Sequence, residues 1–182
     1  MLIENEKWPL LLSLLALLTS NFANASALCA GTENYAISST TPTTDFIDNG
    51  DGTVFHKTTG LIWQRCSLGQ IWNVNQCTGK PADYPWVEAL QQAELNTFTG
   101  VNDWRVPNKN ELASIVEYRC HAPAINNQIF PATPSTSSKG YWSSSPYDTY
   151  PDTIWYVEFY YGSVSYLTKG YNNHLRLVRA VQ

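Results

Sequence analysis

Aromatic side chains are concentrated between residues 141 and 171 of the 182-residue chain. Aromatic rings pack against the C–H faces of sugars, and the polar atoms of Tyr and Trp can hydrogen-bond sugar hydroxyl groups. Trp142 and Trp155 fall in predicted strands, so we expect them in the core. Five tyrosines in predicted loops or turns are, together with Lys169, the candidate ligand-binding residues: Tyr147, Tyr150, Tyr160, Tyr161 and Tyr171. The alternative is that these tyrosines only cover irregular backbone.

A second group of polar residues forms a candidate calcium site: Asp45, Asp48, Asn49 and Asp51. Carboxylate and amide oxygens are the ligands that calcium prefers. The full EF-hand pattern is not met, because no acidic residue occupies its twelfth position and the spacing is compressed. The Asn-Gly and Asp-Gly dipeptides in this stretch are also strong turn signals, and Asp and Asn side chains bond their own backbone in turns. A turn that binds no metal is therefore the alternative, and no other cofactor is expected.

Three arginines could each bind a sulfate or a carboxylate through two guanidinium nitrogens: Arg105, Arg176 and Arg179. Bridges inside the fold, to Asp103, to Glu111 or to the backbone, would occupy the same groups. We assign these arginines structural roles.

No catalytic motif is recognisable in the chain. Gly-x-Ser-x-Gly and a glycine-rich phosphate loop are absent, and the three histidines pair with no serine or cysteine nucleophile in sequence. Five glutamates could form a glycosidase pair only if folding brought two of them together: Glu88, Glu94, Glu111, Glu117 and Glu158. We therefore expect no enzyme, and a glycan-acting hydrolase is kept as a third alternative.

The first 25 residues have the pattern of a secretory signal peptide. An apolar run from Pro9 to Leu18 follows Lys7 and precedes Ala23-Asn24-Ala25, a small-x-small cleavage site. The run is too short to span a hydrocarbon layer of about 30 Å as a membrane anchor. We expect cleavage after Ala25 and a periplasmic, cell-surface or secreted location. The formal net charge of −4 gives no reason to expect binding to nucleic acid.

Four cysteines in an exported chain predict two disulfide bonds. Cys66 and Cys77 close a short loop that contains Gly69, which favours a local bond. Cys29 and Cys120 would then join the N-terminal segment to the region after the second predicted helix. The spacing is not that of a zinc site, which needs cysteine pairs closer in sequence.

The remaining pattern predicts one α+β domain over residues 45–182, preceded by an irregular Ser/Thr/Pro-rich arm over 26–44. Apolar spacing predicts a helix over 86–95. Asn108 followed by Glu111 is a capping-box signature, and we extend this second helix to about Arg119. Strands are predicted at 46–47, 53–57, 61–65, 141–144, 154–159, 164–167 and 175–181. The fold class is two short helices set in a mainly antiparallel, loop-rich sheet.

Five motifs occur in an order that resembles the Lcl C-terminal domain family, the C-terminal module of a bacterial collagen-like adhesin. They are Asn-Gly-Asp-Gly-Thr-Val at 49–54, Thr-Gly-Leu-Ile-Trp-Gln at 59–64, Asp-Trp-Arg-Val-Pro-Asn at 103–108 with Glu-Leu at 111–112, Tyr-Trp-Ser-Ser-Ser at 141–145 and Arg-Leu-Val-Arg at 176–179. The resemblance covers about residues 45–181. The pattern is also similar, in a looser way, to C-type-lectin-like folds.

The resemblance implies an exported surface or periplasmic module. In the adhesin, the domain is trimeric and binds sulfated polysaccharides, but this chain has no Gly-X-Y repeat to enforce a trimer. We expect a module that binds polysaccharide or glycosaminoglycan-like glycans at the cell surface. The alternative is a structural or protein-interaction module of a cell-surface or pilus-type assembly. The motif residues are expected to be structural: Trp63, Trp104, Arg105, Glu111, Trp142, Trp155, Arg176 and Arg179.

Overall fold

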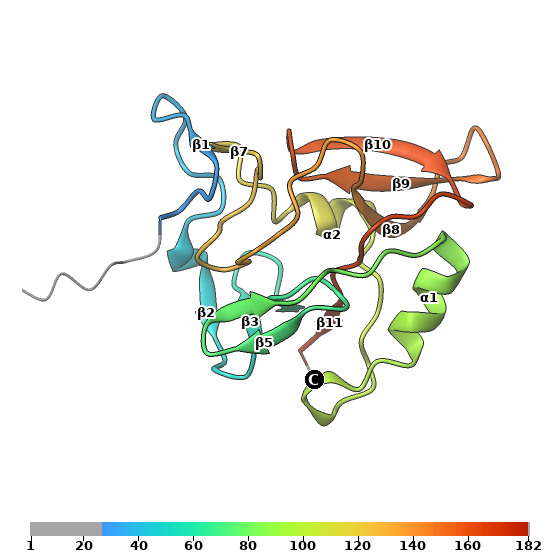
Figure 1. Ribbon diagram of the computed structural model, residues 1–182, viewed down its shortest axis with the longest axis horizontal. Helices are drawn as coiled ribbons and strands as arrows, with labels where there is room; N and C mark the ends of the chain where they lie inside the picture. The colour runs from blue at the N-terminus through green and yellow to red at the C-terminus, as the bar shows by residue number, and fades with distance from the viewer. Residues whose placement is uncertain (1–26, 182) are drawn as a thin grey trace, which may run out of the picture.

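The computed structural model describes residues 27–181, so the predicted signal peptide lies outside the described residues. The chain is α+β, with mostly antiparallel strands, two short α-helices and two disulfide bonds (Figure 1). Across residues 27–181, no helix combines the length and the apolar character needed to cross a membrane.

A four-stranded antiparallel sheet joins the start and the end of the domain. Its strands, in sheet order, are β11 (Val178–Ala180), β4 (Leu61–Gln64), β3 (Thr53–His56) and β2 (Phe46–Asp48). Strand β11 pairs with β4 through Val178 opposite Trp63. The C-terminal Arg-Leu-Val-Arg motif is therefore fixed beside the early Trp-containing strand.

A second antiparallel sheet has the order β10-β9-β8 (Figure 1), and its strands hold five of the aromatic residues between positions 141 and 171. Its strands are β8 (Tyr141–Pro146), β9 (Thr153–Glu158) and β10 (Ser163–Thr168). The register places Trp155 opposite Tyr166. Strand β8 is irregular between Trp142 and Pro146, where its register with β9 shifts. This sheet determines where the candidate ligand-binding tyrosines lie.

Two short ribbons are each tied by a disulfide bond. One ribbon pairs β1 (Thr32–Glu33) with β7 (Cys120–His121), and the other pairs β5 (Ile71–Asn73) with β6 (Gln76–Thr78). The disulfide bonds link Cys29 to Cys120 and Cys66 to Cys77. These are the two pairs that the cysteine spacing favours.

The first helix, α1 (Trp86–Glu94), begins and ends within one residue of its predicted bounds, whereas the second, α2 (Lys109–Ala113), is shorter than predicted. Two 3-10 turns, η1 (Thr43–Asp45) and η2 (Phe98–Gly100), complete the helical elements. Helix α2 begins with a capping box: the Glu111 N–H donates to the Asn108 side chain at 2.9 Å, and the Asn108 N–H donates to the Glu111 carboxylate at 2.7 Å.

The prediction that α2 continues to Arg119 is wrong. The backbone leaves the helix after Ser114 and pairs instead with a later segment: Val116 bridges Ile125, and the Glu117 N–H donates to the Ala124 carbonyl at 3.1 Å. Ile115 and Val116 are β-branched, which favours extended backbone over helix. Both side chains are buried, so the apolar spacing marked core positions correctly although the helix is short.

Two clusters of buried apolar side chains form the core. Trp63 belongs to the first, and Trp104 and Trp142 belong to the second. Arg176 is fully buried and donates to the Arg65 carbonyl and, at 2.8 Å, to the Thr133 hydroxyl. Trp155 was expected in the core, but it is half-buried and lies outside both clusters.

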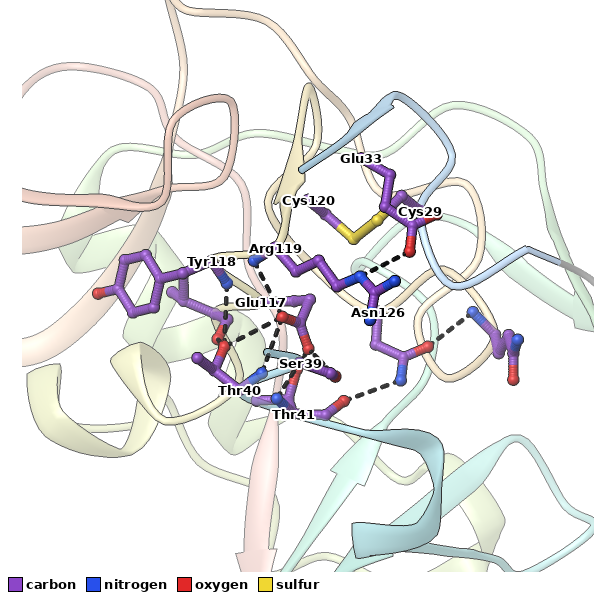
Figure 2. The surroundings of a disulfide bond; sticks show 12 residues. Cys29, Glu33, Ser39, Thr40, Thr41, Glu117, Tyr118, Arg119, Cys120 and Asn126 are labelled. Carbon is purple, nitrogen blue, oxygen red and sulfur yellow. Dashed lines mark hydrogen bonds and ion pairs between the residues drawn. A yellow bond between two sulfur atoms is a disulfide. The ribbon is translucent and has the colours of Figure 1, made fainter. Parts of the chain in front are cut away.

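The N-terminal arm is fastened to the domain by Glu117 as well as by the Cys29–Cys120 bond (Figure 2). The Glu117 carboxylate is fully buried and accepts hydrogen bonds from the Thr40 and Thr41 N–H groups at 2.9 and 2.7 Å, and from the Ser39 hydroxyl at 2.6 Å. Buried carboxylates are stable only when such donors surround them. A buried charge therefore holds the arm against the domain in addition to the disulfide bond.

Candidate ligand-binding site

Four aromatic side chains gather on one face of the β10–β9–β8 sheet and form what we call the aromatic platform: Tyr147, Tyr150, Trp155 and Tyr166. The rings of Tyr147 and Tyr166 stack with centroids 4.1 Å apart and planes 5° apart. Trp155 meets both rings edge-on, at 4.9 and 6.0 Å. Tyr150 and Tyr166 remain 54% and 44% exposed, so the platform presents ring surface to solvent.

The loop between β8 and β9 is held in place by backbone hydrogen bonds. The Tyr147 N–H donates to the Thr153 carbonyl at 3.0 Å, and the Thr153 N–H donates to the Tyr150 carbonyl at 2.9 Å. Lys169 also supports this loop, because its ammonium group donates to the Pro151 carbonyl at 2.7 Å. The hydrogen-bonded loop thus positions Tyr147 and Tyr150, and the pairing of β9 with β10 positions Trp155 and Tyr166.

One cation borders the platform. The Lys109 ammonium group lies 4.4 Å from the centre of the Trp155 ring, within the range of a cation–π contact. Lys109 is the first residue of α2, and its backbone N–H donates to the Ser145 hydroxyl of β8 at 3.0 Å. The capped helix start therefore fixes a positive charge at the edge of an aromatic surface.

The predicted ligand-binding tyrosines do not lie in one place. Tyr147 and Tyr150 belong to the platform, whereas Tyr160 and Tyr161 lie at the opposite end of the same sheet, in the turn between β9 and β10. There they pack with His121, at centroid distances of 5.0 and 5.2 Å. The sequence prediction therefore combined residues from separate surfaces.

Tyr171 and Lys169 occupy further positions. Tyr171 is 62% exposed and lines a cavity of about 190 Å³ beside Tyr156 and Asn173. The Lys169 ammonium group lies 5.5 Å from the centre of the Trp86 ring and bonds the β8–β9 loop. Lys169 thus supports the loop that carries platform residues.

The Asp/Asn group proposed for calcium forms the turn between β2 and β3. Asp48 accepts from the Gly50 N–H at 2.8 Å, Asp51 accepts from the Thr53 N–H at 2.9 Å, and Asn49 donates to the Thr53 hydroxyl at 2.8 Å. Asp48 also pairs with Arg65 at 2.6 Å, and the Asp45 carbonyl bonds the Lys57 N–H. Within residues 27–181, no group of three His, Cys, Asp or Glu side chains could hold a metal ion. These contacts support the turn interpretation.

The arginines assigned structural roles all make contacts inside the fold. Arg105 binds both carboxylate oxygens of Glu111, at 2.7 and 2.8 Å, which raises the pKa of Arg105 and lowers the pKa of Glu111. Arg179 lies 3.6 Å from the Asp103 carboxylate and 5.6 Å from the centre of the Trp104 ring. The Arg105 backbone also pairs with Val178 of β11. Arg105 therefore connects the first turn of α2, through Glu111, to the last strand of the domain.

The glutamates considered for a glycosidase pair have separate surroundings. Glu111 binds Arg105, Glu117 binds the N-terminal arm, and the Glu158 carboxylate accepts from the backbone of the Tyr160–Tyr161 turn. Glu88 and Glu94 are exposed on α1.

The sequence places Tyr166 in the aromatic-rich segment and offers Lys109 as a solvated lysine that could bind an anionic glycan, but it assigns neither to the ligand-binding residues, and it places Trp155 in the core. Residues in β10 alternate between exposed and half-buried from Val164 to Thr168 in the structure, which places Tyr166 on an exposed face, but the sequence of this strand does not alternate regularly between apolar and polar residues. The contact between Lys109 and Trp155 joins a helix to a strand 46 positions later in the chain, and no local pattern encodes it.

These features define an α+β module, tied by disulfide bonds, that presents an aromatic surface beside the Lys109 cation. The Lcl C-terminal domain family model matches residues 52–179, and the chain belongs to this family of adhesin-associated, cell-surface domains. No curated protein matches the chain. The two disulfide bonds are consistent with export.

Proposed function

We propose that the mature chain is an exported module that binds polysaccharide at the cell surface through the aromatic platform. The observation that carries this proposal is the stacked pair of Tyr147 and Tyr166 with Trp155 edge-on against both rings. Exposed Tyr and Trp rings match the C–H faces of sugars, while their polar atoms remain available to hydroxyl groups. A cluster of four such rings offers more contact area than one sugar unit needs, which favours a glycan chain over a single sugar.

An acidic, glycosaminoglycan-like glycan fits this surface best. The Lys109 ammonium group above Trp155 supplies one positive charge where a sulfate or a carboxylate could bind next to a stacked sugar ring. The formal net charge of the chain is −4, so attraction depends on this local cation rather than on the whole molecule.

The test is a glycan array probed with residues 26–182, comparing the native chain with Trp155→Ala and Tyr166→Ala. We expect binding to acidic polysaccharides that both substitutions weaken. Tyr161→Ala is the matched control, because Tyr161 is an exposed tyrosine at the other end of the sheet. Absence of binding to every acidic and neutral glycan would contradict the proposal.

A protein-interaction module of a surface or pilus-type assembly is the second candidate function. It is favoured by exposed tyrosines around the β1–β7 ribbon, where Tyr35 and Tyr118 are 77% and 51% exposed. Substituting these residues would then abolish association with a surface protein and leave glycan binding intact.

We also infer a C-type-lectin-like fold and removal of residues 1–25 on export. Two helices, two disulfide bonds and the pairing of β11 with the early strand β4 support the fold proposal. Superposition of an experimental structure on C-type lectin domains tests it. Mass spectrometry of the exported protein tests cleavage, with Ser26 as the expected first residue.

A further inference from the structure

A small cavity lies against the face of the β10–β9–β8 sheet opposite the aromatic platform. Its volume is about 190 Å³, and Tyr156 and Leu167 form part of its wall. Successive side chains of a strand point to opposite faces, so these residues face away from their neighbours Trp155 and Tyr166. The cavity is smaller than drug-sized ligand pockets, which start at roughly 300 Å³, and suits one small ring.

The cavity has one aromatic side. Tyr156 is half-buried and meets the Trp142 ring edge-on at 6.4 Å, and Tyr171 stands exposed at the opening. A side chain on Gly140 would collide with the Tyr156 ring, so the glycine allows this ring to lie against the backbone at the cavity wall. The result is an apolar surface of the kind that packs against a ring of C–H groups.

The opposite side of the cavity is polar. Asn173 is 1% exposed, and its side-chain oxygen accepts from the Gly140 N–H at 2.9 Å. Its side-chain nitrogen is buried and has no hydrogen-bond partner within residues 27–181. A buried donor without an acceptor is unfavourable, and a hydroxyl oxygen that reached it would satisfy it. The hydroxyl groups of Ser137 and Ser138 add exchangeable donors and acceptors at the lining.

The charged side chains of Lys139 and Glu158, which border the cavity, already have partners inside the fold. The Lys139 ammonium group binds the Asp83 carboxylate, which lowers the pKa of Asp83. The Glu158 carboxylate accepts from the Tyr161 N–H at 3.2 Å and from the Ser163 hydroxyl at 3.4 Å. With both charges bound within the fold, the cavity favours a neutral ligand.

We propose that this cavity binds a single neutral pyranose ring, with its C–H face on Tyr156 and Tyr171 and a hydroxyl group accepting from Asn173. A pyranose combines one apolar face with hydroxyl groups around its edge, which matches the two sides of the cavity. The site is separate from the platform and does not depend on it, because the two lie on opposite faces of the sheet.

The experiment is a ¹H–¹⁵N NMR titration of residues 26–182 with four probes: the methyl glycosides of glucose, galactose, mannose and N-acetylglucosamine. We expect at least one probe to shift, saturably, the Asn173 side-chain amide and the backbone amides of residues 138–140. Tyr171→Ala should weaken this binding about fivefold, since a stacking contact is lost. Asn173→Asp replaces the amide donor with an acceptor and should remove the shifts.

Tyr161→Ala is the control, because Tyr161 is 61% exposed, close to the 62% of Tyr171, and its ring packs with His121 and Tyr160 rather than in the lining of the cavity. Tyr166→Ala should leave the cavity titration unchanged, which separates failure of this proposal from failure of the platform. If Asn173→Asp does not fold, the affinity of Tyr171→Ala for the sugar tests the proposal alone. The proposal is overturned if none of the four sugars shifts the cavity resonances, or if Tyr161→Ala weakens binding as much as Tyr171→Ala.

Discussion

Tyr147 and Tyr166 stack almost in parallel, with ring centroids 4.1 Å apart, although one belongs to the β8–β9 loop and the other to β10. Trp155, between them in sequence, meets both rings edge-on. Rings that already pack against one another lose little conformational entropy when a ligand binds, and this preorganisation favours binding. The contact therefore links the folding of the sheet to the proposed recognition of a glycan.

Lys109→Gln should weaken binding to an acidic polysaccharide about threefold and make the remaining binding less sensitive to salt, because one cation beside Trp155 is lost. Titration calorimetry at two salt concentrations measures both effects. Lys80→Gln is the matched control, since it removes the same charge from an exposed residue of the loop before α1. Equal losses in both variants would show that only net charge matters.

Asn108→Ala should destabilise the protein by about 1 kcal/mol, because the side-chain acceptor of the α2 capping box is lost. Urea denaturation measures the change. Asn110→Ala, an exposed position inside the same helix, should change stability little. Since the capped start of α2 positions Lys109, the same Asn108 variant should also bind acidic glycan more weakly. Unchanged stability would contradict the role assigned to the cap.

Glu117→Gln should destabilise the protein by about 2 kcal/mol, since a fully buried carboxylate that accepts several hydrogen bonds becomes a neutral amide. The N-terminal arm should then become sensitive to protease between residues 34 and 44 while the Cys29–Cys120 bond remains. Thermal unfolding and limited proteolysis measure the two effects. Glu88→Gln, on the exposed face of α1, is the control and should behave like the native chain. An arm that stays resistant in Glu117→Gln would contradict this account.

Stability should fall on acidification in two stages. Burial lowers the pKa of His56 and of His174 below 6.5, against smaller raising effects of Asp45 on His56 and of the Ala82 carbonyl and Asp83 on His174. Burial acts to raise the pKa of Glu117, but hydrogen bonds from Ser39, Thr40 and Thr41 outweigh it, and the net pKa lies below 4.5. Groups with a lowered folded-state pKa contribute stability above their unfolded pKa and lose it as the pH falls through the folded value.

The melting temperature should therefore decline as the pH falls below 6.5, and again below 4.5. His56→Phe should reduce the first decline, because a ring that stacks on Phe46 at 4.5 Å is kept without a group that titrates. A melting temperature that rises between pH 7 and pH 5 would contradict the assignment. Phosphate and acetate buffers of equal ionic strength separate the pH effect from a salt effect.

Features encoded by local spacing could be read from the sequence. The capping box of Asn108 and Glu111 depends on residues three positions apart, and the Cys66–Cys77 bond closes a short loop. The extent of α2 could not be read in this way, because Val116 and Glu117 pair with a segment beyond the helix.

The candidate site depended on register and was harder to predict. Tyr150 and Tyr160 are near in sequence, but the six-residue strand β9 separates them by roughly 20 Å at about 3.3 Å per residue. Strand alternation assigns Trp155 to the core, but Val157 on the same face belongs to a core cluster, whereas Trp155 contacts Lys109 and Tyr166 outside it. Only the pairing of β9 with β10, together with the position of α2, determines which aromatic rings meet.

The most direct test of the aromatic platform is the affinity of the native chain and of Tyr166→Ala for the best acidic polysaccharide on the array. We predict a loss of about tenfold for Tyr166→Ala, equivalent to about 1.4 kcal/mol, in a variant that remains folded at the assay temperature although it loses the stack on Tyr147. Tyr161→Ala should retain native affinity. Equal affinity of the native chain and Tyr166→Ala would contradict the platform as the binding surface.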